Sequence, residues 1–272
     1  MSNEKKTENG LQAMFATIVI PVLFVVAWLF YAYVLGNPAN FEGGNPDNHP
    51  IKEGIGKWFA TIYKGGVIVP ILIGVNLIII TFSIERAITV AKAKGKGRVD
   101  VFIRTIRALL VSDNIEGAIA ECDKQKGSCA NVLRSGLIKY KFVKGDHTLD
   151  KEAKIAAIQK ELEEAVSLEL PMLSKNLVII STCASISTLI GLIGTVLGMI
   201  RAFSALAGAG GAPDAAQLSI GISEALINTA LGIIGSCIAI VMYNYFTNKI
   251  DQLTYGIDEA NFSVVQSFAS KN

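Results

Sequence analysis

The chain has 272 residues, a hydrophobic content of 51% and a formal net charge of +2. A mean hydropathy of +0.45 is too apolar for an ordinary soluble domain and is typical of polytopic membrane proteins. Most cations fall between Arg86 and Lys175, where acidic residues are interleaved and stacking aromatic residues are missing, which argues against a nucleic-acid partner. The four cysteines form no CxxC pair and have no histidine nearby, so we expect reduced structural thiols and neither a metal nor a cofactor.

The first apolar run extends from Leu11 to Leu35. A cleaved signal peptide is the alternative interpretation, but its apolar core usually has about 7 to 15 residues, and this run is far longer. We therefore expect an uncleaved transmembrane helix at 11–36, after a cytoplasmic N-terminus at 1–10.

The second apolar run follows a loop at 37–64 that is rich in Asn, Pro and Gly. We expect this loop on the periplasmic side, with one short interfacial helix near Trp58. The second transmembrane helix is predicted at 65–91, and the charges of Glu85 and Arg86 indicate re-entry into the cytoplasm. If they form only an exposed ion pair at a helix end, they contribute well under about 1 kcal/mol.

The region 92–170 has the apolar periodicity of amphipathic helices with charged outer faces. Its basic character places it in the cytoplasm by the positive-inside rule. We interpret it as a helical cytoplasmic insert, because no residue pattern in it is typical of a nucleotide site or an enzyme. The expected helices are 100–111, 114–122, 129–142 and 148–170.

The last two spans are predicted at 171–203 and 218–248, joined by a periplasmic turn at 204–217 and followed by a cytoplasmic tail at 249–272. Four spans place both termini in the cytoplasm. The predicted fold class is all-α: a multi-pass membrane protein with four transmembrane helices and a helical cytoplasmic insert.

Four polar residues within these last two spans are candidates for an ion pathway. A carboxylate in hydrocarbon costs several kcal/mol unless it faces protein or water, which makes Glu224 a functional-site candidate. Asn228 lies one turn further along, and Thr195 and Thr229 add hydroxyls that can bond to carbonyls of their own helices.

Small residues accompany these polar groups, and they predict close helix packing at Gly191, Gly194, Gly198 and Gly232. In the fourth span, polar and small residues share a broad face. Because a single helix pair cannot enclose such a face, we expect the chain to oligomerise into a closed ring.

Two motifs occur in the expected order and spacing: Gly191-Leu-Ile-Gly-Thr195-Val-Leu-Gly198-Met-Ile, then Gly221-Ile-Ser-Glu224-Ala-Leu-Ile-Asn-Thr229-Ala-Leu-Gly followed by Tyr243-Asn-Tyr-Phe. Together they resemble the paired pore-helix signature of the ExbB/TolQ/MotA proton-channel family, and within it ExbB most. The resemblance covers roughly Glu85 to Ile250.

The resemblance implies a homopentamer around a two-helix core supplied by an ExbD- or TolR-like partner, a single-span protein whose membrane aspartate carries the ion. It also implies a channel subunit in the bacterial inner membrane that uses the proton-motive force to energise TonB-dependent transport at the outer membrane through a TonB-like protein. Thr195 and Thr229 would line the path near the carrier, with Glu224 toward the outer half. Because this chain has no aspartate in any expected span, its carrier is Glu224 or a partner's group. No catalytic residues and no enzyme activity are expected.

Several alternatives remain open at this stage. Family members usually carry Ala-Pro where this chain has Ser187-Thr188, and the added oxygens could suit Na⁺ instead of H⁺. ExbB has three spans, whereas four are typical of MotA. A TolQ-like subunit, a gliding or flagellar stator subunit, and a non-conducting membrane scaffold are therefore the other interpretations.

Overall fold

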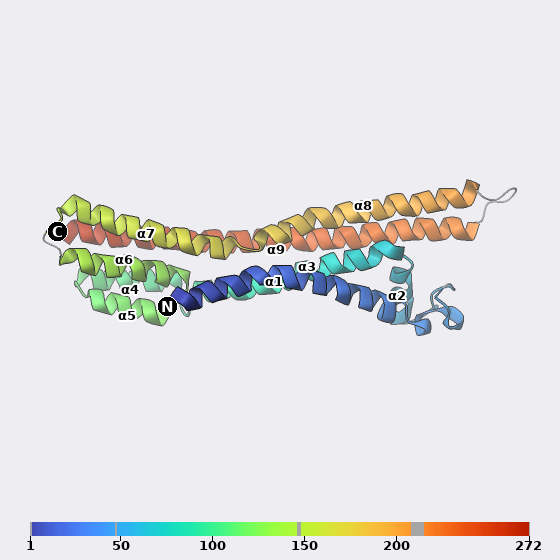
Figure 1. The fold of residues 1–272 in the computed structure, drawn as a ribbon, viewed down its shortest axis with the longest axis horizontal. Coiled ribbons are helices and arrows are strands. Elements are labelled where there is room, and N and C mark those ends of the chain that lie inside the picture. The colour runs from blue at the N-terminus through green and yellow to red at the C-terminus, as the bar shows by residue number, and fades with distance from the viewer. Residues whose placement is uncertain (1, 47, 146–147, 208–214, 272) are drawn as a thin grey trace. The chain divides into compact units, whose positions relative to one another are not determined.

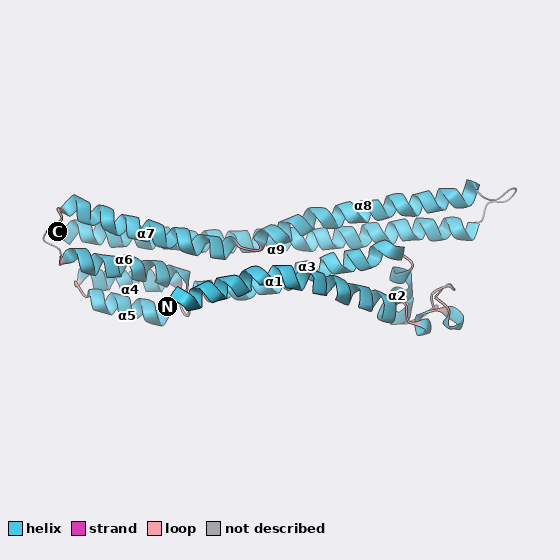
Figure 2. Cartoon of the chain, viewed as in Figure 1, coloured by secondary structure: helices cyan, strands magenta, loops and turns pink. Residues whose placement is uncertain are grey.

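The computed structural model describes residues 2–46, 48–145, 148–207 and 215–271, without the side chains of 2–14, 207 and 271. Every named element in these ranges is a helix, which confirms the all-α class (Figure 2). Of the turn expected at 204–217, residues 208–214 lie outside the described part of the chain.

The chain divides into two compact units. The span unit contains Met1–Ser83 and Val178–Tyr243, and the bundle unit contains Ile84–Leu177 and Asn244–Asn272. Two long helices contribute to both units: α3 (Val69–Lys94) and α9 (Ala215–Lys271).

The span unit holds the apolar helices. Helix α1 (Ser2–Leu29) continues into a π-helical turn, η1 (Phe30–Leu35), so the helix includes polar residues before the first apolar run. Helix α8 (Leu177–Ala207) and the first half of α9 run side by side as a hairpin (Figure 1). Four segments are long and apolar enough to cross a membrane, as predicted: Phe15–Leu35, Gly66–Val111, Lys151–Leu206 and Ala215–Ser270.

Between the first two apolar helices the chain forms short elements. They are η2 (Pro38–Asn40), η3 (Glu42–Gly44), α2 (Ile55–Tyr63) and η4 (Gly66–Ile68), and α2 confirms the short helix expected near Trp58. Asn40 donates to the carbonyls of Val34 and Leu35 at 2.8 and 3.1 Å, which satisfies the end of η1.

The bundle unit contains four shorter helices and the second half of α9 (Figure 1). All four predicted helices are confirmed, with ends shifted by up to about one turn. Side-chain caps explain two of the starts, because Asn114 accepts from the amide of Gly117 and Asp150 from that of Ala153, both at 2.8 Å. The helices are α4 (Val99–Val111), α5 (Ile115–Gln125), α6 (Ser128–Lys144) and α7 (Lys151–Ser174).

The segment 249–272 was expected as a tail, but its described residues, 249–271, are helical and contribute to the bundle core. Helix α9 continues to Lys271, and its Ile257, Val264 and Phe268 are fully buried. The Phe268 ring packs edge-on against Tyr140 of α6 with 4.7 Å between ring centroids. The segment therefore stabilises the bundle unit through buried apolar area.

The helix boundary expected at Pro171 is displaced. Helix α7 runs through Pro171 to Ser174, and α8 begins at Leu177. The break falls at Asn176, whose φ of +66° lies in the left-handed region that Asn tolerates better than most residues. Pro171 has no N–H to donate to the carbonyl of Ser167, so α7 loses one hydrogen bond in its last turns.

Two cysteines of the bundle core supply a pH prediction. Cys122 and Cys129 are 2% and 4% exposed, and burial raises the pKa of both thiols from 9.0 to about 12. We expect maleimide to label them at least about 100-fold more slowly at pH 8 in the folded protein than in SDS, because the thiolate is the reactive form. The pKa of each thiol is higher in the folded state than in the unfolded state. The contribution of these thiols to the free energy of unfolding is therefore fully present below about pH 9 and is lost as the pH rises toward 12. Equal labelling rates in the two states would contradict this burial.

Candidate functional site

Helices α8 and α9 of the hairpin cross at the point where glycines bring their two backbones close together. A Cβ atom at Gly198 would lie 2.7 Å from the Gly221 carbonyl oxygen, and one at Gly232 would lie 2.7 Å from the Ser187 carbonyl oxygen. Gly191 and Gly194 make similarly close approaches to α9. The structure thus places all four predicted packing glycines at this crossing, where van der Waals contact between backbones is gained.

Two threonines meet at the same crossing. The hydroxyls of Thr195 and Thr229 are hydrogen-bonded to each other, and both are partly exposed. Thr195 also lies 3.3 Å from the Gly191 carbonyl oxygen, and Thr229 lies 3.1 Å from that of Ala225. Each hydroxyl has one proton to donate, so either threonine can donate to the other while its partner donates to a helix carbonyl. The pair can therefore switch between two hydrogen-bonded arrangements.

Asn228 is fully buried beside this pair. Its amide nitrogen donates to the Gly65 carbonyl at 2.8 Å, while its Oδ1 atom has no partner among the described residues. Gly194 of α8 lies directly against the Asn228 side chain. The segment before α3 thus supplies a third wall around the polar face of α9.

Glu224 is also enclosed within the chain, at 2% exposure. Its carboxylate accepts a hydrogen bond from Arg201 of α8 at 2.5 Å. Gly66, with a φ of +77°, approaches so closely that a side chain there would collide with the carboxylate. The Glu224 charge is therefore paired inside its own subunit.

These contacts correct one step of the sequence argument. The polar face of α9 does not require other subunits to enclose it at Glu224, Ala225 and Asn228, because α8 and the Gly65–Gly66 turn already bury them. Sequence reasoning also missed Arg201. The sequence contained a signal for this ion pair: Arg201 and Glu224 lie at similar distances along the chain from the hairpin turn, as Thr195 and Thr229 do, so the two members of each pair are expected at the same level of the hairpin.

We expect Arg201→Ala to lower the free energy of unfolding by about 2–3 kcal/mol. The substitution leaves the buried Glu224 carboxylate without a cation. The loss of stability is smaller than for a fully buried ion pair, because the Arg201 side chain is 56% exposed. Adding Glu224→Gln should restore most of the stability. A double-mutant cycle of melting temperatures in detergent measures this coupling, and additive effects would contradict the pairing.

A hydroxyl-lined groove lies on the same hairpin, and its nearest hydroxyl residues, Thr188 and Ser236, are each seven residues along the chain from Thr195 and Thr229. This cavity of about 310 Å³ is bordered by hydroxyl side chains from both helices. Ser185 and Thr188 of α8 are exposed in the isolated chain, although they occur in an apolar span. Hydroxyls on a span surface are poor partners for lipid chains, so such a groove fits water or another polypeptide. The hydroxyl residues of the groove are Ser181, Ser185, Thr188, Ser236 and Tyr243.

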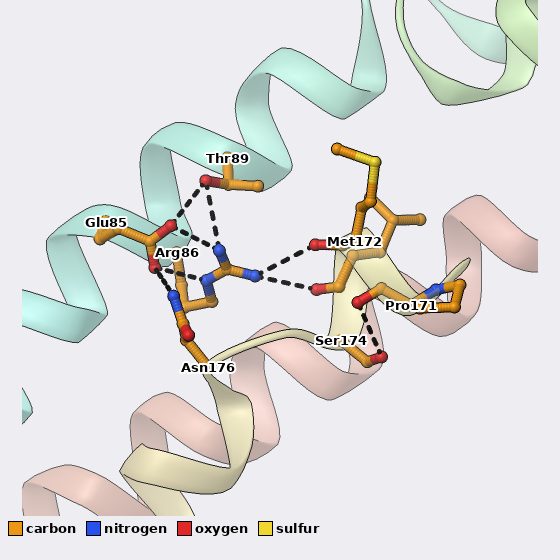
Figure 3. Close-up of polar contacts among 8 residues, drawn as sticks. Glu85, Arg86, Thr89, Pro171, Met172, Ser174 and Asn176 are labelled. Carbon is orange, nitrogen blue, oxygen red and sulfur yellow. Dashed lines mark hydrogen bonds and ion pairs between the residues drawn. The ribbon is translucent and has the colours of Figure 1, made fainter. Parts of the chain in front are cut away.

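A separate polar cluster in the bundle unit joins α3 to the break between α7 and α8 (Figure 3). Arg86, only 2% exposed, donates to the Leu173 carbonyl at 3.1 Å and to Glu85 through two nitrogens at 2.5 and 2.7 Å. Asn176 and Thr89 also donate to Glu85, at 3.3 and 3.0 Å. The buried Arg86 and the partly buried Glu85 therefore belong to a network that caps α7, and they are not the exposed ion pair considered from the sequence.

Four apolar helices that enclose polar side chains define a multi-pass membrane protein. The model of the MotA/TolQ/ExbB proton channel family matches residues 125–259, about half of the chain. This region, which contains Thr195, Arg201, Glu224, Asn228 and Thr229, belongs to that family, as the sequence motifs predicted.

Relatives within the family carry different names. A putative biopolymer transport protein, ExbB-like 3 of Synechocystis sp., is 37% identical over 86 residues, which cover 31% of this chain and 41% of that protein. The Tol-Pal system protein TolQ of Pseudomonas aeruginosa is 30% identical over 45% of this chain and 52% of its own length. The biopolymer transport protein ExbB of Pseudomonas putida is 27% identical over 54% and 44%. The chain thus spans about half the length of these relatives.

Proposed function

We propose that the chain is the channel-forming subunit of an ExbB-type motor in the bacterial inner membrane, which uses the proton-motive force to energise TonB-dependent transport. The observation that carries this proposal is the Thr195–Thr229 hydroxyl pair, which shares the α8–α9 hairpin with a hydroxyl-lined groove that begins seven residues further along each helix. Hydroxyls both donate and accept hydrogen bonds, so a row of them can pass a proton or support a file of water.

The ion carrier of this motor belongs to a partner. Glu224 is held by Arg201 and enclosed by Gly66, which leaves it little freedom to take up and release an ion. The expected spans of this chain contain no aspartate. We assign the carrier to an ExbD- or TolR-like single-span protein, with a TonB-like protein using the resulting motion. Glu224 and Arg201 then form a fixed charge pair beside the path.

The exposed hydroxyls support an assembly around that partner. Ser185 and Thr188 would face lipid in an isolated subunit, whereas a ring of subunits turns such a face toward a central helix. A homopentamer is the arrangement we propose. The basic bundle unit, with 92–170 and 249–272, would lie in the cytoplasm, and 37–64 and 204–217 would lie in the periplasm.

Co-purification with a co-expressed single-span partner, followed by native mass spectrometry, tests the assembly. We expect five copies of this chain around partner helices, and proton uptake into proteoliposomes only when both proteins are present. Replacing the partner's membrane aspartate by Asn should leave the complex intact and stop the flux. A monomer, or a ring that binds no partner in lipid nanodiscs, would favour the non-conducting scaffold.

A TolQ-like role is the second candidate, because two TolQ proteins match this chain at 30% and 35% identity. Deletion in the source bacterium separates the roles. The ExbB-type proposal expects loss of siderophore or vitamin uptake with normal motility and cell constriction. A constriction defect alone would support the TolQ-like role, and a motility defect alone would support a stator. Flux driven by a Na⁺ gradient in place of a pH gradient would identify Na⁺ as the ion.

A further inference from the structure

The bundle unit contains a cavity of about 500 Å³ that is separate from the hydroxyl groove. It lies between the end of α3, the start of α4 and the middle of α9. Its inner wall is apolar, because Phe246 and Leu253 are buried at 1% and 8% exposure and Val90 faces it from α3. Pockets of this size accommodate small amphiphilic ligands.

The rim of the cavity is cationic. Of its lining residues, all within the described part of the chain, three are cations, Lys94, Arg98 and Lys249, and one is a carboxylate, Asp100. Asp100 is 3.5 Å from Arg98, and both side chains are more than 70% exposed, so this pair is weak. Lys249 lies 3.5 Å from the Gln252 side-chain oxygen, a neutral group. A net positive charge therefore remains at the rim.

The cavity begins where two apolar helices turn polar. In α9 the apolar sequence ends at Tyr245 and Phe246, and Lys249 follows one turn later, with its ammonium 5.9 Å from the Tyr245 ring centroid. In α3 the last turn carries Lys92 and Lys94. Aromatic residues followed by cations are typical of the headgroup level of a bilayer.

The geometry points to a binding site for an anionic phospholipid, with its phosphate between Lys94 and Lys249 and an acyl chain against Val90 and Phe246. A free phosphate would leave the apolar wall without a partner. Along α3, Val90 precedes Lys94 by one turn, and along α9, Phe246 precedes Lys249 by about one turn, so each helix presents an apolar group and then a cation, as an acyl chain is followed by a headgroup. This site is independent of the proposed ion pathway, since it shares no residue with it.

Lipid titration of the full-length protein in detergent tests the site. Dissociation constants for phosphatidylglycerol and for phosphatidylcholine with the same acyl chains are measured by native mass spectrometry. We expect tighter binding of phosphatidylglycerol, and about 25-fold weaker binding to Lys94→Gln/Lys249→Gln, at about fivefold for each cation lost near a membrane surface. The matched control is Lys124→Gln in α5, which removes an exposed lysine of the same unit away from the cavity.

A second variant keeps the test decisive if the double variant does not fold. Ala91→Trp fills the cavity without changing its charge, and it should also weaken phosphatidylglycerol binding. Equal binding to the wild type and both variants would overturn the proposal, as would equal affinity for phosphatidylcholine. Displacement of the lipid by inorganic phosphate at matched concentration would overturn it too, because the site would then recognise phosphate alone.

Discussion

Replacing Thr195 or Thr229 by Val should reduce ion flux through the assembled channel by about 100-fold, the lower range of what positioned proton-transfer groups contribute. Val keeps the shape of the side chain and removes the hydroxyl, which breaks the Thr195–Thr229 hydrogen bond. Stability should change little, by about 0.6 kcal/mol for one lost interhelical hydrogen bond. Proteoliposomes with a pH-sensitive dye inside measure the flux.

Thr195→Ser and Thr229→Ser are the matched controls, because they retain the hydroxyl and lose only a methyl group. We expect them to conduct within a few-fold of the wild type. Normal flux through both Val variants, in complexes that retain the partner, would exclude the hydroxyl pair from the ion pathway. A large fall in melting temperature with normal flux would indicate that the pair only packs the hairpin.

Replacing Arg86 by Ala should destabilise the bundle unit by about 3 kcal/mol, the low end for a broken buried ion pair. The substitution leaves Glu85 without its cation and the Leu173 carbonyl without its donor. The loss stays near the low end because Glu85 is 24% exposed and keeps its contacts with Thr89 and Asn176. Thermal unfolding in detergent, followed by circular dichroism, measures the effect.

Two further variants define the origin of that loss. Arg86→Lys keeps the charge but cannot reproduce the two-nitrogen contact with Glu85, so an intermediate loss is expected. Arg134→Ala removes an exposed pair with Asp123 in the same unit and should cost under about 1 kcal/mol. Equal effects of Arg86→Ala and Arg134→Ala would contradict a structural role for the buried network.

The sequence predicted elements well where one periodicity dominated. Uncharged runs long enough to cross a bilayer identified the four spans, and the apolar faces of 92–170 identified four helices. It was less informative at helix junctions. The third span was expected to begin at Pro171, but α7 runs through Pro171 to Ser174. The end of α7 is capped by Arg86, which donates to the Leu173 carbonyl although the two residues are 87 positions apart in the sequence. The same limit applies to 249–272, because a helix is recognised as part of a core only once its partners, such as Tyr140, are known.

At the candidate site, the sequence by itself determined the residue types: hydroxyls, an amide, a carboxylate and small residues within spans that should be apolar. Residue type is enough for that step, because a polar group in hydrocarbon is costly wherever it points. Only the tertiary structure decided which groups meet. It paired Glu224 with Arg201, joined Thr195 to Thr229, and enclosed Asn228 with the turn at Gly65. Pairing depends on the register of the hairpin and on a third segment more than 100 residues away, and neither is encoded in local periodicity.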